Sequence, residues 1–248
     1  MMKKEGTEIL PGIEIRGLCL YIRAEDTLVF ADLHLGYEEE LRRMGILVPG
    51  FQYKEITARL EKIIFSIRKE GKLKRAVIDG DLKHEFGRIS EQEWNEVMGF
   101  LSFLEKHFEE TVLVKGNHDN ILGPIAGRKN LSVVEYLFLE KEKIYIAHGH
   151  RIPEDPEFRE AEIVLIAHDH PAVSLRDAAK TEKVKCFLSG KWKKKILIQL
   201  PSTCFATMGS DPVAEEALSP FLENGRESFD AYCVEGSEVF YFGKLRNI

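Results

Sequence analysis

Short apolar runs that end abruptly in polar residues are the main pattern along this chain. The runs cover residues 28–31 before Asp32 and His34, 76–78 before Asp79 and Asp81, 112–114 before Asn117 and His118, 144–147 before His148, and 163–166 before His168 and His170. Each run has the length and β-branched content of a buried strand. In an open α/β sheet, ligands bind beyond the carboxyl ends of the strands. We therefore expect these polar side chains to meet at one edge.

Two stretches between the early strands have helical spacing. Apolar residues recur over 56–67, and Gly71 ends the pattern; a second stripe runs over 94–108. Ser90 and Glu93 form a capping box before that second stripe. Strands that alternate with helices predict a parallel sheet with crossover connections. The segment around Gly45 and Gly50 is expected to be irregular.

Strands dominate the rest of the predicted structure. An N-terminal pair is expected at 18–22 and 27–31, and short strands at 144–147, 163–167, 184–188, 195–200, 231–234 and 239–242. Residues 210–219 are predicted to form a surface loop with a short helix. The fold class is α/β, with two sheets packed face to face, helices outside, and one domain over residues 1–248.

Composition and charge limit the binding partners and the cellular location that we expect. Lys and Arg total 35 against 41 Asp and Glu, a formal charge of -6, so the bulk charge does not indicate nucleic-acid or anionic-membrane binding. The four cysteines form no Cys-x-x-Cys pair, and no segment has the length of apolar sequence that spans a bilayer. We expect a cytoplasmic protein without a membrane partner, and the sequence leaves its oligomeric state open.

One local basic segment allows two interpretations. Residues 191–195 hold four lysines around Trp192, and further lysines lie at 180, 183 and 185. Such a hairpin can follow a nucleic-acid backbone and stack a base on the indole ring. The preferred interpretation is an edge hairpin whose lysines prevent sheet-to-sheet pairing.

The polar strand ends indicate metal chemistry. Burying several carboxylates and imidazoles beside one another is costly unless positive charge neutralises them. A mixed set of oxygen and nitrogen donors suits divalent transition metals. The residues alone therefore favour a hydrolase with two metal ions.

Taken in order, these motifs resemble the signature of the calcineurin-like metallophosphoesterases. The segments that carry the resemblance are Asp32-x-His34, Gly80-Asp81, Gly116-Asn117-His118-Asp119, His148-Gly149 and His168-x-His170. Residues 31–38, 80–86, 201–203 and 242–245 further resemble the small phosphoesterases related to the SbcD nuclease, the ligase-associated branch. The resemblance implies a four-layer α-β-β-α sandwich of two mixed sheets flanked by helices.

The resemblance also implies roles for individual residues. One metal is held by Asp32, His34 and His170, a second by Asn117, His148 and His168, and Asp81 bridges them. A hydroxide bridging the metals is the implied nucleophile. His118 is not a ligand: it faces the phosphate and stabilises charge or protonates the leaving oxygen. Two divalent ions are the implied cofactors, manganese first, with iron, nickel and zinc as alternatives.

Two positions depart from the wider superfamily. Many phosphatases of the superfamily have an aspartate three residues after the bridging one, where this chain has His84, as SbcD-type nucleases do. His84 is therefore a second catalytic candidate and favours diester cleavage. Ala167 takes the place of a usual glycine; if that position requires positive φ, alanine costs roughly 1 kcal/mol.

Several alternatives stay open at this stage. The expected reaction is hydrolysis of nucleic-acid or nucleotide diesters, and the rivals are a phosphomonoesterase or a cyclic-nucleotide phosphodiesterase. A non-catalytic scaffold, like the retromer subunit with this fold, is the rival from another class. The expected partners are a phosphate-ester substrate, with DNA as a candidate, and DNA-repair proteins by family resemblance.

Other polar residues have ordinary explanations. His107 is read as a cation at a helix C-terminus, and His150 and Arg151 either touch substrate or are solvated. Asp119 either supports His118 or caps the following helix.

Overall fold

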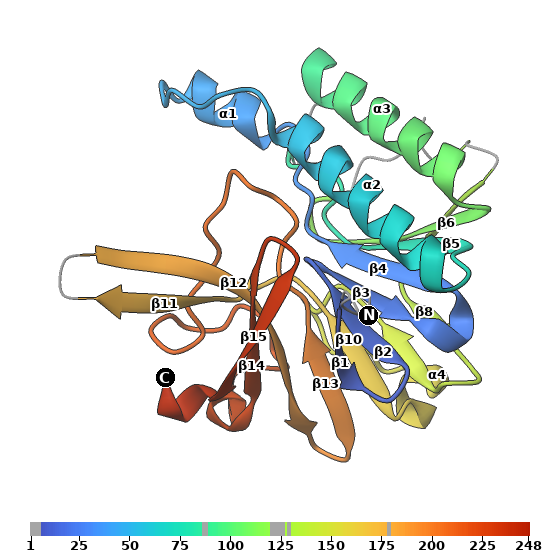
Figure 1. The fold of residues 1–248 in the computed structure, drawn as a ribbon, viewed down its shortest axis with the longest axis vertical. Coiled ribbons are helices and arrows are strands. Elements are labelled where there is room, and N and C mark those ends of the chain that lie inside the picture. The colour runs from blue at the N-terminus through green and yellow to red at the C-terminus, as the bar shows by residue number, and fades with distance from the viewer. Residues whose placement is uncertain (1–5, 86–88, 120–126, 128–129, 178–179) are drawn as a thin grey trace.

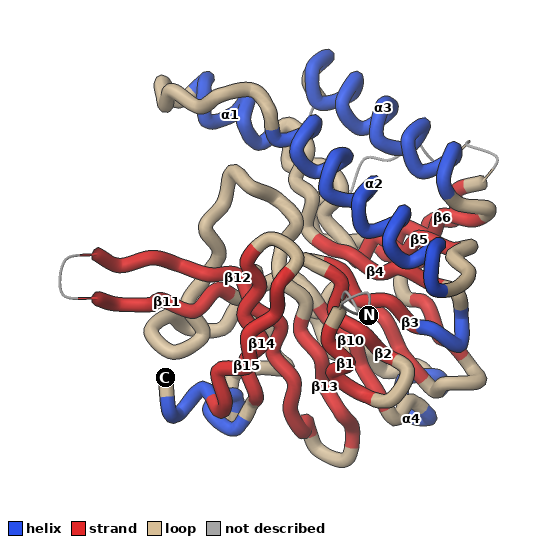
Figure 2. The backbone as a smooth tube through the Cα atoms, in the orientation of Figure 1, coloured by secondary structure: helices blue, strands red, loops and turns tan. Residues whose placement is uncertain are grey.

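Two mixed β-sheets lie against each other, and the long helices cover the outer face of one of them (Figures 1 and 2). The structure is a computed structural model, which describes residues 6–85, 89–119, 127, 130–177 and 180–248. This arrangement confirms the predicted fold class.

The first sheet has seven strands in the order β1-β2-β3-β4-β5-β6-β7. They are β1 (Thr7–Leu10), β2 (Ile13–Arg16), β3 (Cys19–Ile22), β4 (Thr27–Ala31), β5 (Arg75–Asp79), β6 (Glu110–Val114) and β7 (Leu131–Val134). Pairing is antiparallel from β1 to β4 and parallel from β4 to β7. The predicted crossover order is confirmed for β4, β5 and β6. Strand β2 was not predicted, because Glu14 and Arg16 break its apolar pattern yet are buried as an ion pair at 2.6 Å.

The second sheet has eight strands in the order β15-β14-β12-β13-β10-β9-β8, with β11 paired to β12. They are β8 (Leu137–Leu139), β9 (Ile144–Ile146), β10 (Ile163–Ile166), β11 (Ala172–Asp177), β12 (Lys180–Trp192), β13 (Lys195–Gln199), β14 (Asp230–Glu235) and β15 (Glu238–Lys244). All six short strands expected after His118 are present; β7, β8 and β11 are additional.

The lysine-rich hairpin joins two inner strands of the second sheet, but its residues 190–192 pair with β13 alone among the described strands, so its interpretation as an edge hairpin stays a prediction. Strand β12 pairs with both β13 and β14, and β13 pairs with both β10 and β12. Trp192 packs against the rings of Phe158 and Phe221, at 6.0 and 4.8 Å between centroids. The indole ring is therefore part of an aromatic cluster rather than a free stacking platform.

In the described part of the chain, four helices accompany the sheets: α1 (Tyr37–Arg43), α2 (Gln52–Glu70), α3 (Glu91–His107) and α4 (Pro156–Glu160). Single 3-10 turns lie at η1 (Arg23–Glu25), η2 (Arg226–Ser228) and η3 (Leu245–Asn247). The Ser90 side chain accepts the Glu93 N–H at 3.0 Å, as the capping box predicts, and α2 ends before Gly71. Helix α1 was not predicted, and residues 210–219 form turns without the expected helix.

Alternating side chains of the strands separate the apolar core into three parts. Leu28 and Phe30 of β4 face α2 and α3, whereas Val29 of the same strand faces the second sheet. The outer face of the second sheet is covered by α4 and by loop residues such as Phe221. The layers are therefore helix, sheet, sheet, and a thinner outer layer. Among the described helices, none has the length and apolarity needed to cross a membrane.

Candidate metal centre

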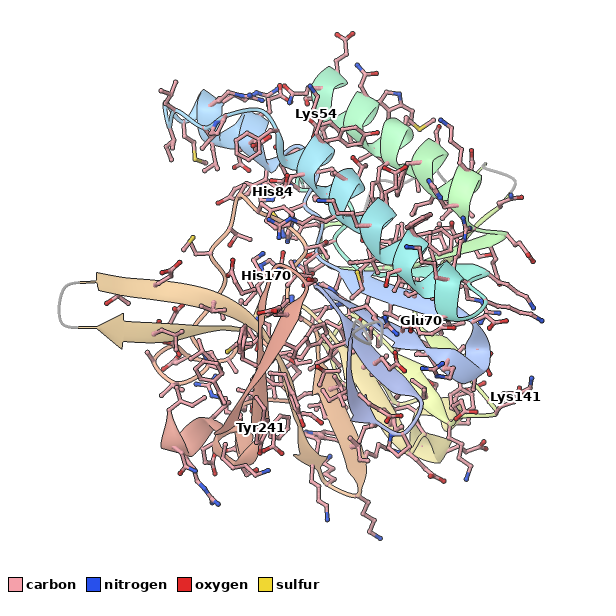
Figure 3. The ribbon with its side chains drawn as sticks, viewed as in Figure 1. Lys54, Glu70, His84, Lys141, His170 and Tyr241 are labelled. Atoms are coloured by element: carbon pink, nitrogen blue, oxygen red, sulfur yellow. The ribbon has the colours of Figure 1, made fainter. Side chains whose placement is uncertain are left out.

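The polar residues that were predicted as ligands converge where the two sheets meet. Asp32 and His34 follow β4, Asp81 follows β5, and Asn117 and His118 follow β6 of the first sheet; His148 follows β9, and His168 and His170 follow β10 of the second. Figure 3 labels His84 and His170 in the middle of the molecule, below α1 and α2. Both sheets thus contribute to one cluster.

Asp81 lies at the centre of this cluster. Its Oδ2 atom is 3.3 Å from His148 Nε2, 3.8 Å from His34 Nε2 and 3.9 Å from His118 Nε2. Its Oδ1 atom accepts the His118 backbone N–H at 2.9 Å. One carboxylate therefore touches residues from both predicted ligand groups.

Each of the two groups is close enough to hold a cation. Ligand atoms of Asp32, His34 and His170 lie within 4.8 Å of one another, as do those of Asp81, His148 and His168. The His34 and His170 Nε2 atoms are 3.2 Å apart. Asn117 Oδ1 is 3.1 Å from His148 Nε2, which places Asn117 beside the second group.

Backbone conformation at the cluster is unusual. Five of the residues have positive φ: Asp32 (51°), His34 (45°), Asp81 (48°), His168 (75°) and His170 (51°). Non-glycine residues adopt this region at a cost of about 1–3 kcal/mol each, and such strain is concentrated at functional sites. Ala167, by contrast, does not have positive φ, so the expected alanine penalty is not incurred there.

Two glycines allow the side chains to approach one another. A Cβ on Gly80, whose φ is +81°, would lie 2.6 Å from His148 Cγ. A Cβ on Gly116 would lie 2.5 Å from the Asp81 backbone nitrogen and 2.8 Å from Asp81 Cγ. Because both distances are far below van der Waals contact, only glycine fits against these two side chains.

Hydrogen bonds to the backbone orient two of the histidines. His148 Nδ1 lies 3.2 Å from the carbonyl oxygen of Asp79, and His118 Nδ1 contacts the carbonyl oxygen of His84. A carbonyl accepts only a hydrogen, so each Nδ1 carries the proton and each Nε2 is left facing the cluster. In metal-binding histidines, the ring nitrogen that does not bind the metal typically donates a hydrogen bond of this kind.

Burial and mutual charge perturb the titration of the cluster. Burial lowers the pKa of His34 to about 3 and that of His168 to about 4, with a further contribution from neighbouring histidines. Burial also disfavours the charged form of His148, but its hydrogen bond with Asp81 and the charge of Asp32 outweigh this and raise its pKa to about 10. Two neutral imidazoles and two carboxylates of lowered pKa, Asp32 and Asp81, are a suitable donor set for divalent cations.

One buried oxygen supports the same conclusion. Asp32 Oδ1 is fully buried without a hydrogen-bond partner among the described residues, and it lies 3.7 Å from His148 Nδ1. A buried carboxylate oxygen is costly unless it is paired or bound to a metal. The residues present therefore fit a pair of metal ions.

The second catalytic candidate, His84, lies at the rim of the cluster. Its Nδ1 is 3.3 Å from His34 Nδ1, its ring lies 4.2 Å from the Tyr37 ring, and its Nε2 contacts the carboxylate of Glu40. Sequence reasoning missed Glu40, because α1 was read as an irregular segment. Glu40 lies four residues after Gly36 on a short helix, and nothing in the sequence around it indicates that it contacts His84.

Asp119 is a buried carboxylate that binds the backbone of two loops. Its two carboxylate oxygens accept the backbone N–H groups of Leu82 and Gly116, at 3.2 and 3.0 Å. Asp119 thus ties the loop after Asp81 to the loop after β6. Its alternative role, as a cap, concerns residues 120–126, which lie outside the described part of the chain.

Of the remaining candidates, only His150 is near the site, with its ring 5.5 Å from that of His148. Arg151 pairs with Glu135 at 2.7 Å. His107 lies in the last turn of α3, as expected, and burial and the charge of Arg68 lower its pKa. Asp79, which was predicted as a polar strand end but given no role, is fully buried, and burial raises its pKa to about 8.

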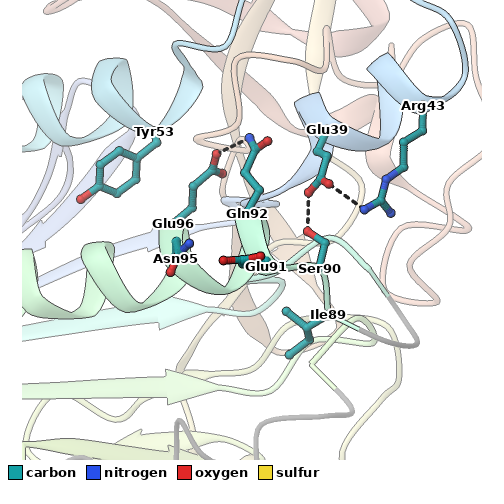
Figure 4. A pocket seen from close by; sticks show the side chains of 9 residues that line it. All are labelled: Glu39, Arg43, Tyr53, Ile89, Ser90, Glu91, Gln92, Asn95 and Glu96. Carbon is teal, nitrogen blue, oxygen red and sulfur yellow. Dashed lines mark hydrogen bonds and ion pairs between the residues drawn. The ribbon is translucent and has the colours of Figure 1, made fainter.

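A hollow on the described surface is separate from this cluster. It has a volume of about 990 Å³ and lies between α1, α2 and α3 (Figure 4). Its side chains pair with one another: Glu39 with Arg43 and Ser90, and Gln92 with Glu96. None of the proposed metal ligands lines it.

Comparison with known proteins agrees with this geometry. The sequence profile of the family described as calcineurin-like phosphoesterase matches residues 26–227. The structure resembles the nuclease MPE of Pseudomonas putida, with a TM-score of 0.65 and 19% identity over 97% of this chain and 100% of that chain. This likeness shows the fold.

Two further structures align more loosely. A single mutant of Vps29 from Entamoeba histolytica has a TM-score of 0.37 and 17% identity over 88% of this chain and 99% of that chain. A phosphoesterase-like protein from Streptococcus pneumoniae has a TM-score of 0.32 and 16% identity over 88% of this chain and 97% of that chain. No curated protein sequence matched. The family profile and the fold together show that the chain belongs to the calcineurin-like phosphoesterases, a family of metal-dependent phosphoric ester hydrolases.

Proposed function

We propose that the protein is a phosphodiesterase that acts on nucleic acid or nucleotide diesters with two divalent metal ions. The observation that carries the proposal is the position of Asp81, whose Oδ2 lies 3.3 Å from His148 and 3.8 Å from His34, one histidine of each group. A carboxylate between two dications offsets their repulsion. This is the arrangement expected of a two-metal phosphoryl-transfer site.

In this proposal, Asp32, His34 and His170 hold one ion, Asn117, His148 and His168 hold the other, and Asp81 is shared. When bound, the ions neutralise the phosphate and activate the attacking water. The protein's own contribution is to fix the donors. The positive φ angles, the close approach of Gly80 and Gly116 and the buried hydrogen bonds all hold the ligand atoms in place before substrate arrives.

His118 is proposed to act on the substrate directly. Its Nδ1 is occupied by the His84 carbonyl, so Nε2 is the atom that faces the centre, 3.9 Å from Asp81 Oδ2. An imidazolium at this place donates a hydrogen bond to the charge that develops on phosphorus oxygens. It can then pass the Nε2 proton to the departing alcohol oxygen.

The choice of diester over monoester rests on His84. The His84 ring lies 5.2 Å from the His34 ring and 5.4 Å from the His118 ring, so the rim near the catalytic histidine is lined by imidazoles. At the position of the carboxylate that many related phosphatases have, this chain thus has an imidazole, and the nearest carboxylate, Glu40, contacts the Nε2 atom of that imidazole. We propose that His84 contacts the substrate beyond the scissile phosphate.

Manganese is the proposed metal, because a mixture of carboxylate, amide and imidazole donors suits it, although iron, nickel and zinc accept the same set. DNA is the proposed macromolecular substrate, and a cytoplasmic location with DNA-repair partners is the proposed setting. The structural relative from Pseudomonas putida is described as a nuclease. That description supports the proposal for this chain without assigning its substrate.

The test compares two chromogenic substrates. Purified protein is loaded with manganese and assayed with bis(p-nitrophenyl) phosphate and with p-nitrophenyl phosphate. We expect kcat/KM for the diester to exceed that for the monoester. A preference for the monoester would identify the phosphomonoesterase alternative, and hydrolysis of cyclic AMP but not of single-stranded DNA would identify the cyclic-nucleotide alternative. Inactivity with manganese, iron, nickel and zinc would support the scaffold alternative.

A further inference from the structure

The backbone of residues 32–34, here called the ligand loop, is held by hydrogen bonds from two directions. Asp32 and His34 have positive φ, and their N–H groups donate to the carbonyl oxygens of Gly80 and Asp81, at 3.1 and 2.9 Å. The carbonyl oxygens of the loop are bound by side chains from other parts of the chain. Non-glycine residues keep such a conformation only where the surrounding structure imposes it.

Gln52, the first residue of α2, binds the ligand loop through its carboxamide. Nε2 donates to the carbonyl oxygens of Leu33 and His34, at 2.9 and 3.2 Å. Oε1 accepts a hydrogen bond from the Cys204 thiol at 3.3 Å, so the amide nitrogen is the end that faces the loop. Because Gln52 is only 3% exposed, losing its side chain would leave buried carbonyl oxygens without these donors.

The segment after β13 binds the backbone at the start of the ligand loop. The Ser202 hydroxyl donates to the carbonyl oxygen of Asp32 at 2.7 Å, and the Cys204 N–H donates to the same oxygen at 3.2 Å. Thr203 binds the carbonyl oxygen of Ala31 through its N–H group and its hydroxyl, at 2.9 and 2.8 Å. The position of Asp32 therefore depends on this segment.

Lys185 of β12 binds the same segment. Its ammonium group donates to the carbonyl oxygen of Ser202 at 2.8 Å and contacts that of Cys204. The centroid of the Phe205 ring lies 5.7 Å from Nζ. Burial lowers the pKa of this ammonium to about 8. An ammonium that is largely removed from water is costly unless it is hydrogen-bonded, and the two carbonyl oxygens supply such bonds.

These contacts connect two side chains from α2 and β12 to the metal ligands. The carbonyl oxygens of residues 31–34 all accept hydrogen bonds from Gln52 or from residues 202–204, and Lys185 holds residues 202–204. We propose that Gln52 and Lys185 are positioning residues, which hold the ligand loop in its positive-φ form so that its carboxylate and imidazole face one metal ion. This inference rests on the proposed two-metal site, and it concerns residues that bind no metal themselves.

Manganese binding to the full chain tests this proposal. Gln52→Leu removes both donors, and we expect it to raise the dissociation constant of one manganese ion about 10- to 100-fold, because the groups that orient metal ligands have effects of this size. The second ion should bind with wild-type affinity, because its proposed ligands lie outside the ligand loop. Lys185→Met should weaken the same single ion. Titration calorimetry of the metal-free protein with manganese chloride measures both affinities.

Each variant has a matched control. Gln92→Leu removes a carboxamide that binds Glu96 at 2.8 Å on α3, and Lys183→Met removes an ammonium that binds Glu215 at 2.7 Å, two residues from Lys185 on β12. We expect both controls to bind two manganese ions with wild-type affinity. If either control weakened one ion as strongly as its test variant, the proposal would be overturned.

Hydrogen exchange of the metal-free protein tests the positioning without metal or activity. We expect amides of residues 31–35 to exchange at least about tenfold faster in Gln52→Leu, while β10 exchanges as in the wild-type chain. Wild-type exchange in the ligand loop, equal acceleration in β10, or equal weakening of both ions would overturn the proposal. A wild-type chain that binds two manganese ions but cleaves no diester would instead contradict the proposed function and leave this inference standing.

Discussion

Gly116→Ala should displace the central carboxylate of the proposed metal centre. Gly116 follows β6, and its φ is not in the positive range, so alanine can adopt its backbone conformation. The added methyl group would lie 2.5 Å from the Asp81 backbone nitrogen and 2.8 Å from Asp81 Cγ. An ordinary contact of that kind is about 3.5 Å, so Asp81 or the Gly116 loop must move by about 1 Å.

A movement of this size exceeds what metal coordination tolerates. Bond lengths to a metal vary by only about 0.2 Å from their usual values. A misplacement of about 1 Å in an active site can cost about 100-fold in rate. We therefore expect Gly116→Ala to lose at least one bound metal and to reduce kcat/KM for a diester about 100-fold.

The assay combines metal content, measured by mass spectrometry after manganese loading and gel filtration, with turnover of bis(p-nitrophenyl) phosphate. Gly50→Ala is the control, because a methyl group there meets only the end of the flexible Arg42 side chain and the φ of Gly50 is also not positive. Two bound metals and wild-type turnover in Gly116→Ala would refute the reasoning that Asp81 is held between the metals by this close approach.

Three further changes probe the same site. His118→Ala should reduce turnover about 100- to 10,000-fold while both metals stay bound, because His118 is proposed to move a proton and not to bind metal; parallel loss of metal would contradict this. Glu40→Gln should lower kcat several-fold without changing metal content, because it weakens the contact that orients His84; an equal effect of Glu39→Gln on the same helix would show that the helix, not the contact, matters. Asp79→Asn should stabilise the metal-free protein, measured by urea unfolding in chelator. Burial raises the pKa of Asp79 from 3.8 to about 8, so its stabilising contribution is present below pH 3.8 and is lost as the pH rises toward 8. The advantage of the variant should therefore grow from pH 4 to pH 8, and a constant difference would argue against a charge effect.

The sequence predicted the parts of the site that lie at strand ends. Residues such as Asp32 and Asp81 follow short apolar runs, and the geometry of a parallel sheet brings the ends of neighbouring strands together. The same pattern predicted the residues after β9 and β10, although these strands belong to the second sheet. For these residues, the pattern of apolar runs in the sequence agrees with the tertiary structure. The convergence of their side chains could therefore be predicted for each residue.

Other features depend on contacts between distant segments. Helix α1 is rich in charged residues, and its one buried residue, Glu38, accepts the N–H groups of Phe51 and Gln52 at the start of α2. Its helical form therefore depends on packing that no periodicity reveals. Likewise, Trp192 is drawn into an aromatic cluster by Phe158 and Phe221, and the lysines beside it gave no sign of this.

The central claim is that Asp81 lies between two bound metal ions, and an anomalous difference map of crystals grown with manganese tests it most directly. The account predicts two peaks about 3.5–4 Å apart, with Asp81 in contact with both. One peak contacts Asp32, His34 and His170, and the other contacts Asn117, His148 and His168. A single peak, or two peaks that Asp81 does not join, would contradict the account.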